Sequence, residues 1–200
     1  MNELYFKISF VVLFIIYILI RVPFDKKYQQ EEKIKIVNAS VEKFLLILMS
    51  LGLLFIPLFW LCTPFLNSFN LGFPTWLRVL GIAISIISLF YFSWIHKTLG
   101  ENWSPTLEIR KGHQLIKTGP YKSIRHPMYA QIFLWTIAQA LIISNLFAGF
   151  SGLVVMAILY LVRVPKEEKM MQDTFGEEYT SYMKQTGRVF PKFIRKEHFE

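Results

Sequence analysis

The sequence predicts an all-α fold, a polytopic membrane helix bundle of about five transmembrane helices with a cytoplasmic C-terminal amphipathic helix. Two observations lead to this prediction. The 200 residues are 54% hydrophobic and 16% aromatic, a composition too apolar for an ordinary water-soluble fold. In addition, residues 44–77, 79–95 and 127–162 contain no charged residue and no histidine. The surplus apolar surface is therefore expected to face lipid.

The apolar runs divide into five predicted spans, because a helix needs roughly 20 residues to cross the hydrocarbon core. Pro23 is expected to end the first span, and the run 127–162 is too long for one helix but suits two. A turn at Ser144 and Asn145, or at residues 149–152, would fold this run into a helical hairpin. The other predicted spans are residues 4–22, 41–62 and 75–95.

Lysine and arginine predict the orientation of the spans, since positively charged loops stay on the cytoplasmic side of a membrane. These residues are frequent in segments 23–40 and 96–126 and in the C-terminal tail, whereas the other two loops have almost none, with Arg78 the one exception. We therefore expect the N-terminus outside and the C-terminus in the cytoplasm. The net charge of +8 is expected to meet anionic lipid headgroups rather than nucleic acid, because the basic residues form no separate domain.

The C-terminal region predicts an amphipathic cytoplasmic helix packed against the membrane face. Pro165 is expected to restart the chain after the fifth span, and Pro191 to end this helix. Lysine and glutamate alternate here with larger apolar or aromatic side chains. Those that recur at helical spacing are Met171, Phe175, Tyr179 and Tyr182.

The histidines and the single cysteine predict no metal centre. His96, His113 and His198 are isolated from one another, and no pair of histidines or cysteines has the spacing of metal ligands. Cys62 has no partner for a disulfide within the chain.

Two predicted cytoplasmic stretches, residues 99–129 and 163–190, contain nearly all the unusual polar residues. If the fourth and fifth spans form an antiparallel hairpin, the start of one lies beside the end of the other. A convergent polar cluster at a membrane surface is thus expected, and it is a candidate active site. Its members are Arg125, His126, Tyr129, Arg163, Glu167 and Glu168.

The start of the predicted fourth span has the features of an anion-binding site. Pro127 favours the first helical position, which places His126 at the cap and leaves backbone N–H groups unpaired beside Arg125. Arg163 and Glu167 are four residues apart and share a helix face. The arginine could hold a carboxylate, and the glutamate could hold an ammonium or ribose hydroxyls. The alternative is that these residues only anchor helix ends at the water boundary.

An ordered set of motifs occupies the C-terminal half of the chain: Leu99-Gly100-x-x-Trp103-Ser104, Gly119-Pro120-Tyr121-x-x-x-Arg125-His126-Pro127-x-Tyr129, Arg163-x-x-x-Glu167-Glu168, Phe175-Gly176-x-x-Tyr179-x-x-Tyr182 and Arg188-x-x-Pro191. This set resembles the isoprenylcysteine carboxyl methyltransferase family and its bacterial relatives, and is also similar to phospholipid N-methyltransferases. The ordered set is much more specific than any one motif. One position departs from the family pattern, since Gln131 stands where the family commonly has glycine.

The resemblance implies that S-adenosylmethionine binds between the last two spans and their cytoplasmic extensions, and that a lipophilic acceptor enters sideways from the membrane. Arg163 and Glu167 are then expected to be catalytic residues near the acceptor. The chain would divide into N-terminal transmembrane helices, residues 1–98, and a methyltransferase core, residues 99–200. The residues expected to bind the cofactor are Tyr121, Arg125, His126, Tyr129 and Glu168.

We therefore predict an integral membrane methyltransferase that uses S-adenosylmethionine to methylate a lipophilic acceptor, such as the carboxylate of a prenylated cysteine-like lipid, at the cytoplasmic membrane interface. Methyl transfer is an in-line displacement, so the protein mainly aligns the reactants and excludes water. A carboxyl, an amine or another acceptor atom is equally compatible with the sequence. Two alternatives are an NAD(P)H-dependent membrane reductase of the sterol-reductase type and a non-enzymatic assembly or transport accessory protein.

Overall fold

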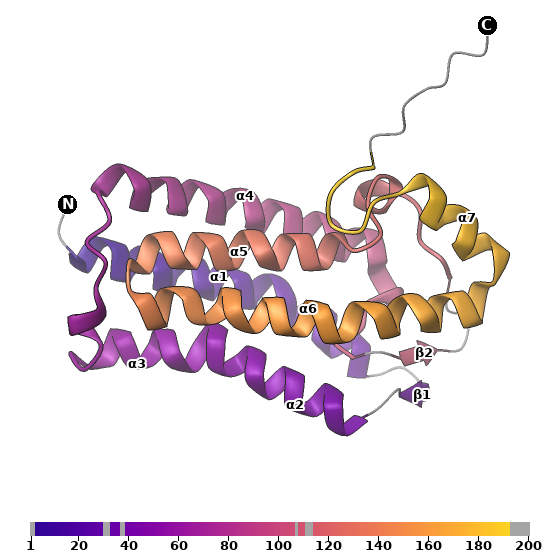
Figure 1. Ribbon diagram of the computed structural model, residues 1–200, viewed down its shortest axis with the longest axis horizontal. Coiled ribbons are helices and arrows are strands. Elements are labelled where there is room, and N and C mark those ends of the chain that lie inside the picture. Colours follow the sequence, from indigo (N-terminus) through magenta and orange to yellow (C-terminus); the bar gives the residue numbers. More distant parts are fainter. Residues whose placement is uncertain (1–2, 30–32, 37–38, 107, 111–113, 193–200) are drawn as a thin grey trace, which may run out of the picture.

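The computed structural model describes residues 3–29, 33–36, 39–106, 108–110 and 114–192, and helices account for most of them (Figure 1). The helices are α1 (Glu3–Gln29), α2 (Ala39–Ser50), the π-helical turn η1 (Leu51–Phe55), α3 (Ile56–Cys62), α4 (Thr75–Leu99), α5 (Pro127–Ile143), α6 (Leu146–Phe175) and α7 (Glu177–Gln185). Two short strands, β1 (Lys33–Ile36) and β2 (Glu108–Arg110), pair antiparallel and join the α1–α2 connection to the segment after α4. The predicted helical membrane bundle is confirmed, with this small sheet as an addition.

Four helical segments are long and apolar enough to cross a membrane: Glu3–Asp25, Ser40–Cys62, Thr75–Leu99 and Leu146–Phe175. A fifth apolar helix, α5, has 17 residues, and a helix of that length extends only about 25 Å. It lies between α4 and α6 (Figure 1), and most of its central residues are buried. A shorter helix suits this position because neighbouring helices, rather than lipid, cover it. The chain is a multi-pass membrane protein.

The break between α5 and α6 falls at Ser144 and Asn145, the first of the two predicted positions. Ser144 has a left-handed backbone (φ 52°), and the Asn145 side chain accepts two hydrogen bonds of 3.1 Å from the first N–H groups of α6. The alternative turn at residues 149–152 is wrong, because these residues lie inside α6. Gly149 packs so closely on α5 that a Cβ would come within 3.2 Å of the Ala140 Cα.

Pro23, expected to end the first span, and Pro165, expected to restart the chain after the fifth, do not interrupt their helices. Pro23 lies inside α1 and Pro165 lies inside α6, so both prolines are internal. An internal proline removes one backbone hydrogen bond, a loss that a long helix packed along its length tolerates. Pro191 ends no helix either, since α7 stops at Gln185.

The predicted C-terminal amphipathic helix is divided between two helices. Gly176 adopts φ 53°, a left-handed value that glycine takes readily, and it separates α6 from α7. Met171 and Phe175 therefore lie on α6, whereas Tyr179 and Tyr182 lie on α7 with buried side chains. The turn at this glycine folds α7 back towards the start of α5 (Figure 1).

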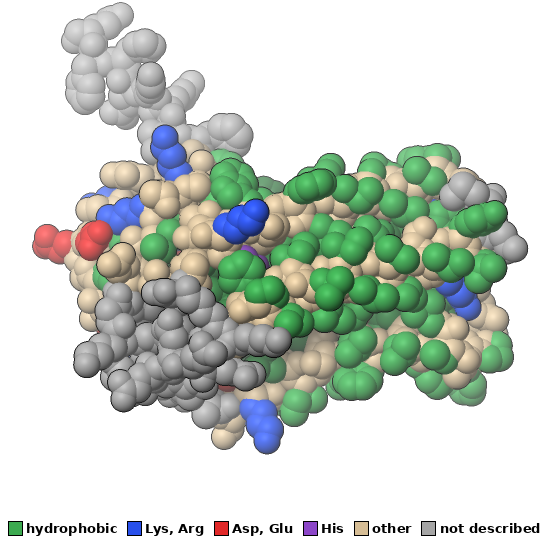
Figure 2. Space-filling view, turned by 180° about the vertical axis from the view of Figure 1, so that it is seen from behind, with side chains coloured by type: hydrophobic (Ala, Val, Ile, Leu, Met, Phe, Trp, Pro, Cys, Tyr) green, Lys and Arg blue, Asp and Glu red, His purple; other side chains and the backbone are tan. Residues whose placement is uncertain are grey.

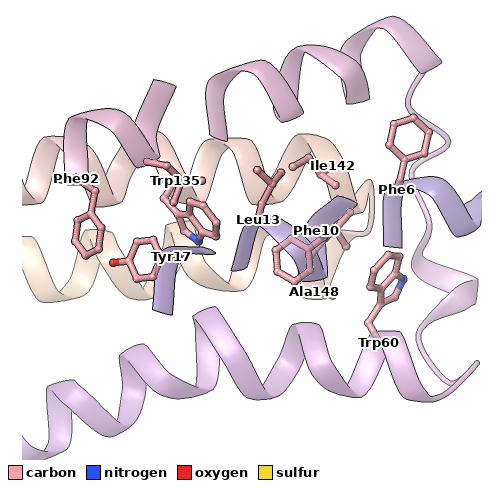
Figure 3. Packing of buried hydrophobic residues seen from close by; sticks show 11 residues of the cluster. Phe6, Phe10, Leu13, Tyr17, Trp60, Phe92, Trp135, Ile142 and Ala148 are labelled. Carbon is pink, nitrogen blue, oxygen red and sulfur yellow. The ribbon is translucent and has the colours of Figure 1, made fainter. Parts of the chain in front are cut away.

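The interior of the bundle is an aromatic cluster around α1 (Figure 3). Tyr17 of α1 stacks on Phe92 of α4 with 4.3 Å between ring centroids, and it lies 4.8 Å from the ring of Trp135 on α5. Phe10 and Phe6, about two and three turns earlier on α1, are buried as well. On the outside, hydrophobic side chains cover the long body, whereas charged side chains gather towards the end that contains α7 (Figure 2). The bundle thus combines an apolar body suited to lipid with a charged end.

Arg78, the exception in the predicted charge pattern, is a packing residue at the opposite end of the bundle. Its guanidinium donates to both carboxylate oxygens of Glu3 at 2.6 and 2.9 Å and to the Ile142 carbonyl at 2.9 Å. It also lies 3.8 Å from the ring centroid of Phe6. These contacts join α1, α4 and α5, which explains a buried arginine in a region otherwise poor in basic residues.

Candidate active site

The structure brings the predicted site residues together at the α7 end of the bundle, where α5 begins and α6 leaves its apolar part. A cavity of about 470 Å³ lies there, lined by residues of α1, α2, α4, α5 and α6 and of the segments around them. Glu168 is buried behind its wall with 5% exposure. The other predicted residues all line the cavity: Tyr121, Arg125, His126, Tyr129, Arg163 and Glu167.

The start of α5 has the predicted cap geometry. Pro127 is the first helical residue, and His126 precedes it with a non-helical backbone (φ −123°). The N–H groups of Arg125 and His126 donate to the carbonyls of Gly187 and Arg188 at 2.8 and 2.9 Å. The segment after α7 therefore covers this helix end, and two of the nearby N–H groups form hydrogen bonds within the protein.

Three basic side chains contact the carboxylate of Glu168. Arg125 donates to Oε1 from Nε and Nη2 at 3.1 and 3.0 Å, and Arg188 donates to Oε2 at 2.7 Å. His126 Nε2 lies 3.3 Å from Oε1, and it carries a proton because an ionised carboxylate only accepts. Arg125 also donates from Nη1 to two backbone carbonyls at the end of α7 and just after it. These contacts hold α5, α6 and the segment after α7 together.

The side chain of Glu167 faces a different surface from that of Glu168. The Tyr129 hydroxyl donates to Glu167 Oε2 at 2.6 Å, and His126 Nδ1 lies 3.7 Å from Oε1. The Glu167 side chain is 27% exposed, against 6% for Glu168. Because consecutive helical residues point about 100° apart, one acid lines the cavity while the other faces Arg125 and Arg188 in the interior.

Arg163 is held between α6, α2 and the segment after α4. Its Nη2 donates to the Pro105 carbonyl at 2.9 Å and lies 3.3 Å from Oε2 of Glu42, an acid of α2 that is only 3% exposed. Its Nε is buried and has no hydrogen-bond partner within the described residues. Since an unpaired buried donor is costly, an acceptor atom on a bound molecule fits this position.

Two tyrosines support the wall between α5 and α7. The Tyr182 hydroxyl donates to the Tyr121 carbonyl at 2.5 Å, and the Ile124 carbonyl lies 3.3 Å from the same oxygen. Burial raises the pKa of Tyr182 to about 12, so the hydroxyl keeps its proton and remains a donor at neutral pH. Burial, and then the charge of Glu167, hold the pKa of Tyr121 well above its usual value. Both side chains therefore present neutral phenols.

The remaining walls of the cavity come from residues that the sequence did not suggest for the site. Arg21 and Asp25 of α1 form an ion pair at 3.1 Å, and Arg21 lies 5.4 Å from the ring of Trp103. His96, at the end of α4, packs on the same ring with 5.3 Å between centroids. The cavity thus joins a charged end to an apolar part within the bundle. Apolar residues that line this part are Phe14, Leu53, Ile132 and Trp135.

Glu42 and Arg21, two residues near the site that were not predicted, differ in what the sequence indicates about them. Glu42 is an acid near the start of an apolar span, and such a residue is a candidate for a paired, buried charge. Arg21 has no comparable signal, because no spacing in the sequence connects the end of α1 with the segment around Trp103. Only the packing of the N-terminal helices brings them together.

Two further sequence expectations concern groups outside the cavity wall. Within the described residues, no group of three or more histidine, cysteine, aspartate or glutamate side chains is placed to hold a metal ion, and His113 and His198 lie outside the described residues. Gln131, the departure from the family pattern, is buried, and its Nε2 donates to the Ser88 hydroxyl at 2.9 Å. This residue therefore joins α5 to α4.

The fold and the site together define a multi-pass membrane protein with a charged cavity at one end of its helix bundle. The model of the isoprenylcysteine carboxyl methyltransferase family matches residues 79–173, from the second turn of α4 to the last turn of α6. The chain is therefore related to this family over that segment, and the resemblance seen in the motifs is confirmed.

Relatives with this name extend the similarity. A protein-S-isoprenylcysteine O-methyltransferase of Saccharomyces cerevisiae is 27% identical over 169 residues, which are 83% of this chain and 64% of the relative. Protein-S-isoprenylcysteine O-methyltransferase B of Arabidopsis thaliana is 25% identical over 109 residues, 54% of this chain and 55% of the relative. The alignments thus cover about half to two thirds of these relatives' lengths.

A solved structure shares the fold. It is that of the eukaryotic intramembrane Ras methyltransferase ICMT, with a TM-score of 0.52 and 23% sequence identity. The superposition covers 78% of this chain and 54% of that one. The likeness therefore extends beyond the segment matched by the family model.

Proposed function

We propose that this protein is an integral membrane methyltransferase that uses S-adenosylmethionine to methylate a lipophilic acceptor at the cytoplasmic membrane interface. The observation that carries the proposal is a single cavity in which the charged residues Arg163 and Glu167 meet apolar side chains from the middle of the spans. A water-soluble donor and a membrane-dissolved acceptor could meet in such a cavity. The names of the relatives support the carboxylate of a prenylated cysteine-like lipid as the acceptor.

The side chains of the cavity suit S-adenosylmethionine. Glu167, partly exposed and held by Tyr129, is placed to accept from an ammonium or from ribose hydroxyls. Tyr121 and Tyr129 add neutral phenol groups to the wall. When bound, this cofactor supplies a methyl group on a cationic sulfonium, so no nucleophilic side chain is required.

The roles of Arg163 and Glu167 depend on the chemical class of the methyl acceptor. A carboxylate acceptor is already ionised at neutral pH and needs alignment, which the unpartnered Nε of Arg163 can provide. An amine or thiol acceptor would need a base, and Glu167 is the candidate. In either case the apolar walls exclude water from the reacting atoms.

We assign cofactor contact to Tyr121, Arg125, His126 and Tyr129, which all line the cavity. Glu168 belongs to the same proposed binding site, and it supports the site chiefly by joining Arg125 to Arg188 of the segment after α7. The orientation that places this end in the cytoplasm, and the division into residues 1–98 and 99–200, are parts of the same proposal.

Purified protein, incubated with S-adenosylmethionine carrying a radiolabelled methyl group and with a total membrane lipid extract, is expected to produce a labelled lipid. N-acetyl-S-farnesylcysteine serves as a defined acceptor, and its product should release labelled methanol in alkali, as a methyl ester does. Binding of NADPH without any methyl transfer would favour the reductase instead. Binding of neither cofactor would favour a non-enzymatic protein.

His126→Ala is expected to abolish measurable binding of S-adenosylhomocysteine in titration calorimetry. The ring lines the cavity and contacts both acids, so its loss removes part of the wall and one contact of Glu167. Lys122→Ala, an exposed change in the same connection, is the matched control and should bind as the wild type does. Wild-type affinity in His126→Ala would reject this assignment.

A further inference from the structure

The wall formed by α1 and the end of α4 carries polar groups that methyl transfer, as proposed above, does not use. Arg21 and His96 both contact the ring of Trp103, and all three side chains line the cavity with Asp25. Neither Arg21 nor Asp25 belongs to the segment that the family model matches. A ligand that fills the cavity would meet this wall as well as the charged end at Arg163.

The ring of His96 offers an unpaired hydrogen-bond acceptor. Its Nδ1 lies 3.0 Å from the Phe92 carbonyl, and because a carbonyl only accepts, this nitrogen carries the proton. In the neutral ring Nε2 then has a free lone pair. Nε2 is buried and has no partner within the described residues, a condition that native proteins seldom leave uncorrected. An N–H group of a bound molecule would satisfy it.

Arg21 offers a cation beside this acceptor. Its Nε donates to Asp25 at 3.1 Å, and its side chain is 37% exposed. A guanidinium has five N–H donors, so it can keep this partner and also bind a carboxylate. The wall therefore combines a site for a carboxylate with a nearby acceptor for an N–H group.

We propose that this wall binds an amino-acid-type end group, with the carboxylate on Arg21 and the adjacent N–H donating to His96 Nε2. The inference rests on the proposed function, and two molecules of that reaction have such an end. One is the cofactor, through its homocysteine part. The other is a prenylated cysteine acceptor, through its amide and carboxylate.

Two variants test the wall. His96→Phe keeps an aromatic ring against Phe24 and Trp103 but removes the acceptor, and Arg21→Met keeps the length of the side chain but removes the charge. For each, calorimetry gives the affinity for S-adenosylhomocysteine, and initial rates give kcat and KM for N-acetyl-S-farnesylcysteine. Each variant is expected to change one of the two quantities by about tenfold or more. Leu19→Ala, on the exposed face of α1, is the matched control.

The results of these measurements show which molecule supplies the amino-acid-type end group, the cofactor or the acceptor. Weaker S-adenosylhomocysteine binding with an unchanged acceptor KM assigns the wall to the cofactor, and the reverse assigns it to the acceptor. His96→Gln, whose amide oxygen can accept, should recover part of the loss. Unchanged values in both variants overturn the inference, and so do equal losses in both quantities with reduced thermal stability. If the wild-type protein neither binds S-adenosylhomocysteine nor transfers a methyl group, the proposed function fails and the inference fails with it.

Discussion

Glu168→Ala is expected to destabilise the protein by about 3–5 kcal/mol, the usual effect of removing one partner from a buried charge cluster. The reason is the geometry around this acid. Arg125, with a 7% exposed side chain, and His126 would lose their shared partner without access to water, whereas the half-exposed Arg188 could turn to solvent. Thermal unfolding of the protein in detergent micelles measures the loss. Limited proteolysis should show earlier cleavage around α7.

Two variants control this result. Glu168→Gln keeps one accepting oxygen but no charge and should lie between the wild type and Glu168→Ala. Lys169→Ala, an exposed change on the next residue of α6, should leave the unfolding temperature unchanged. If Glu168→Ala were as stable as the wild type and lost only cofactor affinity, this acid would contact the ligand directly instead of fastening α7.

Arg163→Lys is expected to lower kcat/KM for N-acetyl-S-farnesylcysteine about 100-fold, the effect of misplacing a reactant by about an ångström. Lysine retains a positive charge near Glu42, so the buried ion pair is not left with a lone acid. It lacks the planar fork and the Nε donor that the cavity leaves unpaired. Initial-rate measurements in detergent or nanodiscs, together with thermal unfolding, separate activity from stability.

Glu42→Gln is the comparison variant for this prediction, because it weakens the hold on the arginine while leaving the arginine itself in place. A moderate change in KM, smaller than the effect of Arg163→Lys, is expected. If Arg163→Lys lowered the unfolding temperature but left kcat/KM at the wild-type value, Arg163 would be only a boundary residue of the helix.

The spans and the convergence of the site could be predicted from the sequence, because both depend on patterns within short segments. Hydropathy identified the apolar runs, and an antiparallel hairpin necessarily places the residues near 126 beside those near 163. The choice between two turns depended on Asn145, whose side chain caps α6. The predictions at Pro23 and Pro165 were wrong, since the effect of a proline depends on how well the rest of its helix is packed.

The partners within the site could not be predicted, because they depend on packing between distant segments. Glu167 and Glu168 are adjacent and chemically alike, and only the packing of α5 and of the segment after α7 makes one a cavity residue and the other an internal anchor. The sequence placed Arg163 near Glu167, but it gave no indication that Glu42 of α2 lies beside the arginine. Arg21 and His96 line the site because they lie on helices that enclose it. No sequence motif marks these two residues.

The contacts of Glu168 also bear on the order in which the protein matures. Arg188 and the backbone at Gly187 complete the cover over the start of α5, and they follow every span in the chain. Synthesis proceeds from the N-terminus, so all the membrane helices can insert before these residues emerge. Until the last segment folds back, Arg125 and Glu168 lack the contacts that this segment provides. The helix bundle can thus be assembled in the membrane while its binding site is still open and unfinished.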